Sequence, residues 1–516
     1  MTMGVGDFPI LSVITFLPLV GALVVALIPR RNVGAIRGAA LFFSLATWVV
    51  SLWLLLGYLP GRETGPGLAF QFVEQVDWIP LFGIEYKLGV DGLAVAMVVL
   101  TTTLTWISIL ASFSPIKERV KEYMISFLIL EVGMLGVFVS LDLFLFYIFW
   151  EVVLVPMYLI IGIWGGANRI YATIKFVLYT LVGSLLMLVA ILATAYAYQA
   201  ATGSWEGAFD LQNLAGHGFD RTFQLFAFAA FALAFAIKVP MFPFHTWLPD
   251  AHVEAPTAGS VILAGVLLKL GAYGFIRFAL PIFPEGAQAF APLIILLSVI
   301  AIIYGAIVAL VQPDLKKLVA YSSVSHMGFV TLGIFIFSEQ GLQGAILQMV
   351  NHGLITGGLF LLVGVIYERT HDRTIAKMGG LGGPVPVFSA ALGFFVFASV
   401  GLPGLAGFVG EFLVFQGTFA FSPWTAAVIV LVMIFAAAYL LWLLQRVLFG
   451  PLSDFLRGLG HHLTDMRPVE ILTLAPLGAL IVILGLFPGL VLELVAGSVS
   501  AVLAAVDPSL ATAIGN

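Results

Sequence analysis

Long apolar runs separated by short polar connections fill almost the whole of this 516-residue chain. Hydrophobic residues make up 61% of the sequence and charged residues only 9%, whereas a soluble domain carries about 25% charged residues. Because a membrane-spanning helix needs roughly 20 apolar residues, the chain has room for about fourteen of them. The sequence therefore predicts an all-α integral membrane protein, and it excludes soluble enzymes and nucleic-acid-binding proteins.

The apolar runs and their breaks place the membrane helices. The predicted ranges are 8–29, 34–58, 88–113, 120–140, 142–165, 168–200, 222–247, 255–280, 288–311, 313–337, 341–368, 385–417, 423–449 and 467–496. The first run lacks a preceding lysine or arginine and an Ala-x-Ala cleavage site, so it is predicted to be a retained helix. The chain forms one polytopic domain with N-terminal helices (1–118), a first repeat (119–281), a second repeat (287–450) and a C-terminal part (451–516).

Lysine and arginine residues concentrate on one side of the predicted bundle. The connections on that side carry Arg30, Arg31, Arg37, Lys117, Arg119, Lys121, Arg169, Lys175, Lys316, Lys317, Arg369, Arg373, Lys377, Arg446, Arg457 and Arg467. The other side carries Arg62, Lys87, Arg221 and Arg277. The positive-inside rule predicts that the first side is cytoplasmic and that both termini lie outside, on the periplasmic face of a bacterial inner (plasma) membrane. The mitochondrial inner membrane is the topologically equivalent alternative.

Two of the predicted helices contain helix-breaking residues. Pro240 and Pro243 interrupt 222–247, and Gly401-Leu402-Pro403-Gly404 interrupts 385–417. A proline leaves the carbonyl four residues earlier without its helical donor, which a membrane protein tolerates only in contact with protein or a wet cavity. Broken helices five helices apart predict two inverted five-helix repeats, helices 4–8 and 9–13, as in transporters. Kinks without function are the alternative.

Five ionisable residues fall inside predicted helices: Glu131, Glu151, Lys238, Lys269 and Glu411. A charge at the centre of a bilayer costs at least about 2.5 kcal/mol, so such residues usually face the bundle interior and serve a pathway. Glu151 and Lys238 lie at similar predicted depth, so we expect them to pair. Moving the carboxylate away would favour release of the lysine proton. A static salt bridge is the alternative, and Glu131 has no evident partner.

Two histidines add titratable groups to the second half of the chain. His326 and His352 carry Ser322 and Gln348 four residues earlier, so each pair shares a helix face. Because histidine titrates near neutral pH, both are candidates for a proton relay, although a structural hydrogen-bonding role is equally compatible. With Glu411 after the second break, these groups favour proton movement over transport of a bulky solute.

Redox centres are not expected in this chain. It has no cysteine, which excludes iron–sulfur ligation, thiolate metal sites and covalent haem attachment. It also contains no nucleotide-binding glycine loop and no metal-ligand cluster. Any electron transfer must therefore belong to a partner.

Several short motifs are shared with a known family. They are Leu88-Gly89-Val90-Asp91-Gly92-Leu93, Trp247-Leu248-Pro249-Asp250-Ala251-His252, and Asp314-Leu315-Lys316-Lys317-Leu318 followed by Tyr321-Ser322-Ser323-Val324-Ser325-His326. In this order the motifs resemble the antiporter-like membrane subunits of respiratory NADH:quinone oxidoreductase (complex I), which are similar to subunits of multisubunit sodium/proton antiporters. Glu411 stands where the sister subunits and the antiporter relatives typically have lysine.

The resemblance implies a proton-translocating subunit of NADH:quinone oxidoreductase without a cofactor of its own. Flavin, iron–sulfur clusters and quinone would belong to partner subunits, and the partners would be other membrane-arm subunits, especially the sister antiporter-like ones, within the lipid bilayer. It also implies that Glu151 pairs with Lys238, that Lys269 links toward the centre, and that Glu411 serves the other half-channel. The alternatives are a sodium/proton antiporter subunit, a haem-containing quinol oxidoreductase with His326 and His352 as axial ligands, and a structural spacer.

Overall fold

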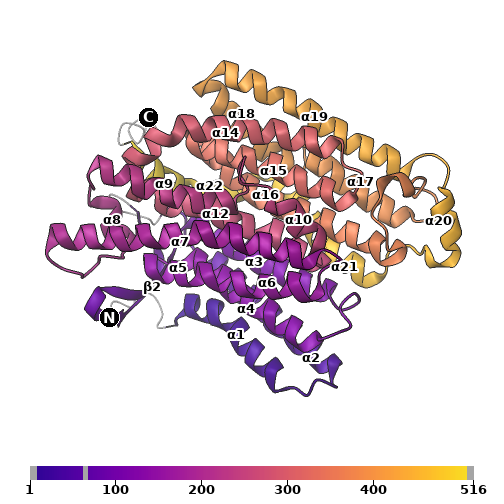
Figure 1. Cartoon of the computed structure of the whole chain (residues 1–516), viewed down its shortest axis with the longest axis horizontal. Helices are drawn as coiled ribbons and strands as arrows, with labels where there is room; N and C mark the ends of the chain where they lie inside the picture. Colours follow the sequence, from indigo (N-terminus) through magenta and orange to yellow (C-terminus); the bar gives the residue numbers. More distant parts are fainter. Residues whose placement is uncertain (1–7, 62–67, 508–516) are drawn as a thin grey trace.

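Most helices of the protein run along the long axis of the molecule (Figure 1). The computed structural model describes residues 8–61 and 68–507. In this part of the chain, 14 helical segments are long and apolar enough to cross a membrane. The predicted helical membrane fold is confirmed.

Most of the helices follow one another with short connections. In the first half they are α1 (Ile10–Leu27), α2 (Val33–Gly57), α3 (Gly92–Ala111), α4 (Val120–Val139), α5 (Leu143–Val152), α6 (Leu154–Trp164), α7 (Arg169–Thr202), α8 (Leu211–Gly216), α9 (Arg221–Lys238), α10 (Trp247–Glu254), α11 (Thr257–Ile262), η2 (Leu263–Leu267), α12 (Leu268–Gly274), η3 (Phe275–Ala279) and α13 (Leu280–Ile282). In the second half they are α14 (Pro284–Leu310), α15 (Leu315–Phe335), α16 (Glu339–Thr370), α17 (Pro386–Val400), α18 (Ala406–Phe421), α19 (Pro423–Leu448), α20 (Asp454–Leu459), α21 (Pro468–Leu486) and α22 (Gly489–Val506). The short turns η1 (Pro80–Phe82), η4 (Ile375–Lys377) and η5 (Gly460–His462) lie in connections.

A β-hairpin that the sequence analysis missed precedes α3. Strands β1 (Gln71–Ile79) and β2 (Ile84–Val90) pair antiparallel, and Gly83 turns the chain between them with a φ of 66°. The predicted helix 88–113 is therefore wrong at its start. Helix α3 begins at Gly92 because the Asp91 side chain accepts a hydrogen bond from the Ala94 N–H at 3.0 Å and caps the helix.

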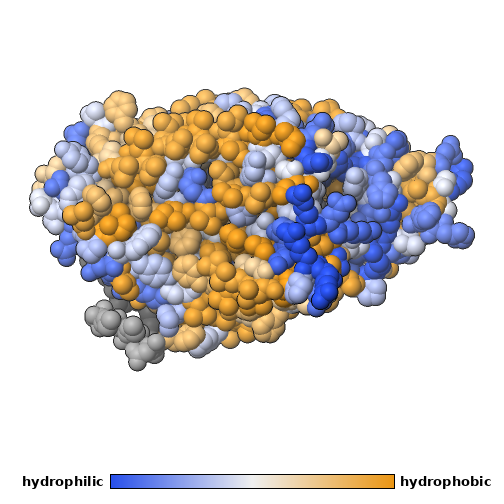
Figure 2. All heavy atoms as spheres, turned by 60° about the horizontal axis from the view of Figure 1, so that its bottom comes forward, coloured by the Kyte–Doolittle hydropathy of each residue, from blue (hydrophilic) through white to orange (hydrophobic). Residues whose placement is uncertain are grey.

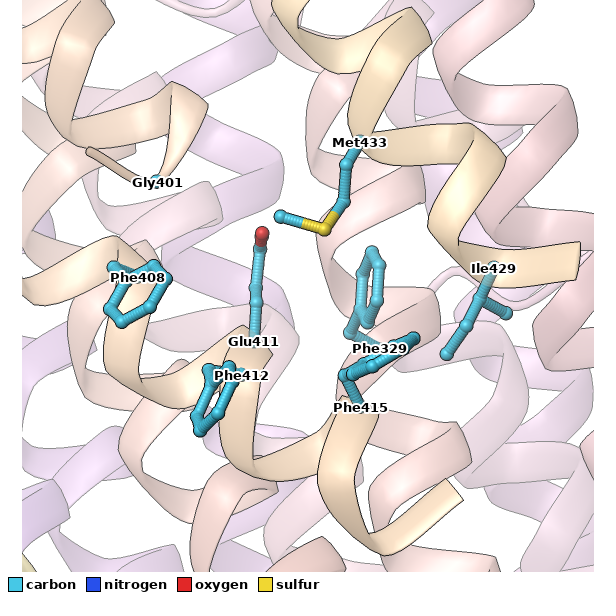
Figure 3. Close-up of a pocket in the computed structure, with 8 residues that line it drawn as sticks. All are labelled: Phe329, Gly401, Phe408, Glu411, Phe412, Phe415, Ile429 and Met433. Atoms are coloured by element: carbon cyan, nitrogen blue, oxygen red, sulfur yellow. The ribbon is translucent and has the colours of Figure 1, made fainter. Parts of the chain in front are cut away.

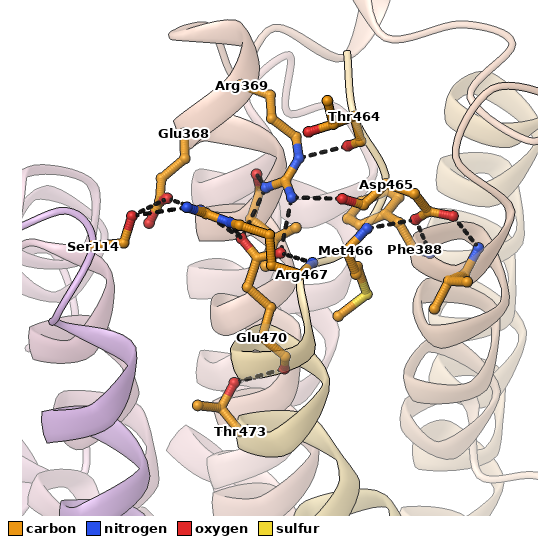
Figure 4. Close-up of polar contacts among 12 residues, drawn as sticks. Ser114, Glu368, Arg369, Phe388, Thr464, Asp465, Met466, Arg467, Glu470 and Thr473 are labelled. Carbon is orange, nitrogen blue, oxygen red and sulfur yellow. Dashed lines mark hydrogen bonds and ion pairs between the residues drawn. The ribbon is translucent and has the colours of Figure 1, made fainter. Parts of the chain in front are cut away.

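The connections predicted to carry most of the basic residues meet at one end of the bundle, which we call the basic end. Here Arg467 contacts Ser114 at 3.2 Å and Glu368 at 2.5 Å, and Arg369 pairs with Glu470 at 2.8 Å (Figure 4). These contacts join the ends of α3 and α16 to the start of α21. Figure 2 shows hydrophilic residues gathered at the end of the molecule where α20 lies, beside an apolar middle. We call the opposite end, which carries β1 and β2, the hairpin end.

The last predicted helix, 467–496, is two helices. Helix α21 ends at Leu486, and α22 starts at Gly489 after Phe487 and Pro488. Helix α22 lies at the hairpin end instead of extending α21: the Ser498 hydroxyl accepts from the Leu93 N–H at 3.3 Å, and Gln288 donates to the Val506 carbonyl at 2.7 Å. The prediction of one continuous helix is wrong because Pro488 cannot donate within a helix, although the apolar composition hides the break.

The segment α11–α13 occupies the centre of the bundle, since every residue from Ala258 to Phe283 is buried. By contrast, α7 presents apolar residues such as Val182 (55% exposed) and Val189 (65% exposed) at the surface, as expected of a helix that faces lipid or another subunit. Both predicted broken helices are interrupted, one between α9 and α10 and the other between α17 and α18. The division into two inverted repeats, and the four-part domain boundaries, stay predictions.

Candidate functional site

Lys238 is the last residue of α9, at the first helix break. Beyond it, the Met241 N–H donates to the Ala236 carbonyl at 2.9 Å, and the Trp247 indole donates to the Ile237 carbonyl at 2.9 Å. The break that Pro240 imposes is therefore compensated by protein groups, as the bilayer requires. These two hydrogen bonds allow α9 to end inside the bundle, with the Lys238 side chain at its last position.

The Lys238 side chain lies among aromatic rings. It is 2% exposed, and its Nζ is 5.2 Å from the centre of the Trp150 ring and 5.9 Å from that of Phe176. The Glu151 carboxylate is close enough to interact electrostatically with Lys238. None of the ion pairs within 4.0 Å among the described residues, however, is formed between these two side chains. The structure brings the predicted partners near each other without direct contact.

The helix that carries Glu151 agrees with the predicted helix 142–165. Helices α5 and α6 together form one continuous span, Leu143–Trp164, because Val153 between them keeps a helical φ of −63° and ψ of −31°. Pro156 has no N–H to donate to Val152, so the span lacks one helical hydrogen bond just after Glu151. Lys238 thus lies at a helix end, whereas Glu151 lies within a continuous helix.

Lys269 lies in the central segment between two π-helical turns, η2 and η3. It is fully buried, and its Nζ donates to the Ala264 carbonyl and lies 2.6 Å from His352 Nδ1. Turns of this kind widen the helix and are frequent at functional sites. The geometry connects Lys269 of the first predicted repeat to a histidine of the second.

The two candidate histidines continue from Lys269 to Glu411. Their ring centres are 5.9 Å apart, and His326 Nδ1 is 2.7 Å from Glu411 Oε1. Gln348 donates to the same carboxylate oxygen at 3.0 Å. The structure therefore groups Lys269, His352, His326 and Glu411 into one buried string, which we call the central string.

Glu411 opens the central string toward a cavity of about 220 Å³. Figure 3 shows its carboxylate pointing into the space between Phe408 and Met433. Glu411 is the one ionisable residue among the residues that line the cavity. The other residues that line it are apolar, and two of them, Phe412 and Met433, are 49% and 40% exposed, so the cavity lies at the surface of the bundle.

Glu131 forms no hydrogen bond to the central string. It lies on α4, is fully buried, and neither carboxylate oxygen has a hydrogen-bond partner among the described residues. The sequence shows no evident partner for Glu131, and the described residues of the folded chain give its carboxylate no hydrogen bond.

Several buried charges escaped the sequence analysis. Arg277, which was assigned to a connection, is 1% exposed and forms an ion pair with Asp91. It also donates to the Tyr273 hydroxyl at 3.0 Å. Lys87, assigned to the same side, is buried and pairs with Asp210 at 2.6 Å. The position of Arg277 inside an apolar run could have indicated its burial. Only the fold shows that Asp91 is its partner.

Lys316 and His252 also belong to this group. Lys316 was assigned to a cytoplasmic connection, yet it is 4% exposed and donates to the Ala255 carbonyl at 2.5 Å. His252 stacks on Phe360 with ring centres 4.7 Å apart, and neither of its ring nitrogens has a hydrogen-bond partner in the described part of the chain. In residues 8–61 and 68–507, no group of three or more His, Asp or Glu residues is arranged to hold a metal ion.

Comparisons with known proteins agree on one family. Residues 140–436 match the family described as NADH:quinone oxidoreductase/Mrp antiporter, transmembrane. NADH-quinone oxidoreductase subunit M of Rhodobacter capsulatus is 50% identical over 509 residues, which cover 95% of this chain and 96% of that protein.

Solved structures extend the likeness to the fold. A chain of respiratory complex I from Thermus thermophilus with bound NADH matches with a TM-score of 0.84 and 33% identity, over 97% of this chain and 99% of that one. The Mrp complex from Dietzia sp. DQ12-45-1b matches with a TM-score of 0.79 over 96% of this chain and 51% of the other; at 24% identity it shows the fold alone. The chain therefore belongs to the family of antiporter-like, proton-translocating membrane subunits of NADH:quinone oxidoreductase.

Proposed function

We propose that Glu151, Lys238 and the central string are the residues through which this subunit moves protons. The observation that carries the proposal is the direct contact of Lys269 with His352 and of His326 with Glu411. Groups joined by hydrogen bonds can exchange protons, and histidine both accepts and donates near neutral pH. The two imidazole rings lie next to each other and link the two contacts.

The Glu151 and Lys238 pair is the proposed input switch. Without a carboxylate nearby, a buried ammonium is unfavourable, whereas an approaching carboxylate stabilises it. Because the two side chains are near but separate and Lys238 lies at a helix break, a small shift at that break changes their interaction. Electron transfer in partner subunits, which would hold the flavin, iron–sulfur clusters and quinone, drives that shift.

The proton then moves from Lys238 to Lys269. The backbone supports this step, since Gly271 packs directly against the start of the Lys238 side chain, two residues from Lys269. From Lys269 the proton passes through His352 and His326 to Glu411 and leaves through the adjoining cavity. The basic end faces the cytoplasm of a bacterial cell with the chain in its inner membrane, and both termini lie outside. Sister antiporter-like subunits flank it.

Lys269→Met in the intact complex tests this pathway. Inverted membrane vesicles report NADH oxidation and proton uptake together. Because a proton-transfer group contributes a factor of about 10² or more, we expect proton uptake to fall at least that far. Lys117→Met, which removes an exposed lysine at the basic end, is the matched control. Full pumping in an assembled Lys269→Met complex would contradict the pathway.

Sodium transport is the second candidate function. The shared fold with the Mrp complex favours it, whereas Glu411 in place of the lysine typical of antiporters disfavours it. Vesicles containing the complex distinguish the two: NADH-driven uptake of labelled sodium supports the antiporter function, and proton uptake that persists without sodium supports the proton pathway.

A further inference from the structure

Glu131 is a buried ionisable group that the proposed pathway leaves unused. Burying a carboxyl group without a hydrogen-bond partner costs free energy, and buried polar groups in folded proteins nearly always have one. Glu131 is fully buried, and both its oxygens lack a partner within residues 8–61 and 68–507. Glu131 thus lacks a partner from the described protein groups in this conformation.

The face of α4 that carries Glu131 identifies the neighbouring helix. Phe138 of α4 packs on Tyr273 of α12 with ring centres 5.0 Å apart, and the Tyr273 hydroxyl donates to the Phe138 carbonyl at 2.7 Å. Glu131 precedes Phe138 by two helical turns and so lies on the same face. Gly136, on the opposite face, packs against Phe149 of α5. Glu131 therefore faces the central segment and not α5.

Glu131 and the amine of Lys269 also lie at the same depth. Helix α4 and the segment α11–α13 both run from the basic end to the hairpin end. Lys269 is one turn before Tyr273, and its side chain reaches back to the Ala264 carbonyl. At 1.5 Å per residue, Glu131 and the Lys269 amine both lie roughly 10 Å from the contact of Phe138 with Tyr273, toward the basic end.

Lys269, in turn, has no acidic partner among the described residues. Its hydrogen-bond partners are a carbonyl and an imidazole, and none of the ion pairs within 4.0 Å among the described residues includes it. A carboxylate close to a buried lysine favours its charged form. Two facing helices thus carry a buried acid without a basic partner, Glu131, and a buried base without an acidic partner, Lys269.

We propose that Glu131 is the proton-loading partner of Lys269. This inference rests on the proposed pathway. While the Lys269 amine contacts His352, the Glu131 carboxyl group is protonated and the amine is neutral. When the lysine side chain turns toward α4, the O–H bond of Glu131 breaks, an N–H bond forms, and an ammonium–carboxylate pair results. The next proton arriving from Lys238 protonates the carboxylate. Lys269 then turns back and gives its extra proton to His352 Nδ1, so one proton enters and one leaves.

The test compares Glu131 variants in the intact complex, with protons pumped per NADH oxidised as the readout. Glu131→Gln keeps the size of the side chain but cannot carry the proton, so we expect the ratio to fall about tenfold or more. Glu131→Asp restores an ionisable group one methylene shorter and should recover part of it, which a packing role would not predict. Glu118→Gln, at the exposed basic end, is the control. In Glu131→Gln/Lys269→Met, the loss should equal that of Lys269→Met alone.

The outcomes separate this inference from the pathway on which it rests. An unchanged ratio in an assembled Glu131→Gln complex, while Lys269→Met stops pumping, overturns the role of Glu131 alone. If Lys269→Met also pumps fully, the pathway fails with it. Should Glu131→Gln not assemble on a native gel, Glu131→Asp decides: a lowered ratio supports the loading role, and an unchanged ratio overturns it.

Discussion

The two broken helices hold their ionisable residues in different ways. At the first break, Lys238 ends α9 and lies against the Trp150 and Phe176 rings, apart from the Glu151 carboxylate. At the second break, Glu411 lies in the second turn of α18 and directly contacts His326 and Gln348. Both residues are buried, but only Glu411 has hydrogen-bonded polar partners and a cavity beside it.

This difference suggests different roles for the two breaks. A charge held by aromatic rings and a carboxylate at a distance responds strongly when the distance changes, because the interaction between charges in a medium of low polarity is strong. A carboxylate fixed by two hydrogen bonds resists such movement, although it exchanges protons along those bonds. We therefore expect the first break to act as the switch and the second as the outlet.

Removing the ionisable group at either break should have the largest effect. Lys238→Met and Glu411→Gln each delete a proton-carrying group, so proton uptake by vesicles should fall by a factor of about 10² or more. The two variants should differ in electron transfer: Lys238→Met, at the switch, should slow NADH oxidation more than Glu411→Gln does. Equal slowing of NADH oxidation would remove the distinction between switch and outlet.

Double variants sharpen the comparison further. Because His326 and Glu411 are in contact, the effects of His326→Gln and Glu411→Gln should overlap, with a coupling free energy of about 0.5–3 kcal/mol in the pumping rate. Lys238→Arg combined with Glu151→Gln gives the corresponding cycle at the first break. The two side chains do not touch in this structure, but a switch requires the carboxylate to approach the lysine during turnover, so we expect a coupling of similar size. A coupling near zero would mean that the pair stays apart and would contradict the switch.

The aromatic contact of Lys238 predicts a moderate effect. Trp150→Leu removes the ring that faces the ammonium, and an interaction of this type contributes about 0.5–2 kcal/mol. The pumping rate should therefore fall a few-fold, with assembly on a native gel retained. Phe146→Leu, which removes a neighbouring ring of α5 that does not contact the lysine charge, is the control. Identical losses in both variants would assign the effect to packing.

The basic end should show the smallest effect. Arg467 is half exposed, and ion pairs at exposed positions contribute at most about 1 kcal/mol. Arg467→Lys should accordingly leave pumping unchanged and lower the thermal stability of the complex only slightly, as measured by loss of NADH oxidation on heating. A large loss of pumping would show that the basic end takes part in proton movement.

Much of the fold could be predicted because lipid imposes simple rules on sequence. Apolar runs of sufficient length must form helices, and the helix bounds agree within a few residues over most of the chain, as for α7 and α16. The predictions failed where short-range features decide the structure. The hairpin β1–β2 turns at Gly83 within a segment of mixed polar and apolar residues, and the separation of α21 from α22 depends on Pro488 within an apolar run.

By itself the sequence determined the membrane fold, the family and some of the buried charges, because a charge in the middle of an apolar run is costly and therefore conspicuous. Only the tertiary structure decided which of these groups meet. Lys269 and His352 are 83 residues apart in the chain, and His326 and Glu411 are 85 apart. Contacts over such separations depend on helix rotation and depth in the packed bundle, which hydropathy does not encode. For the same reason, only packing reveals that Glu131 faces the central segment.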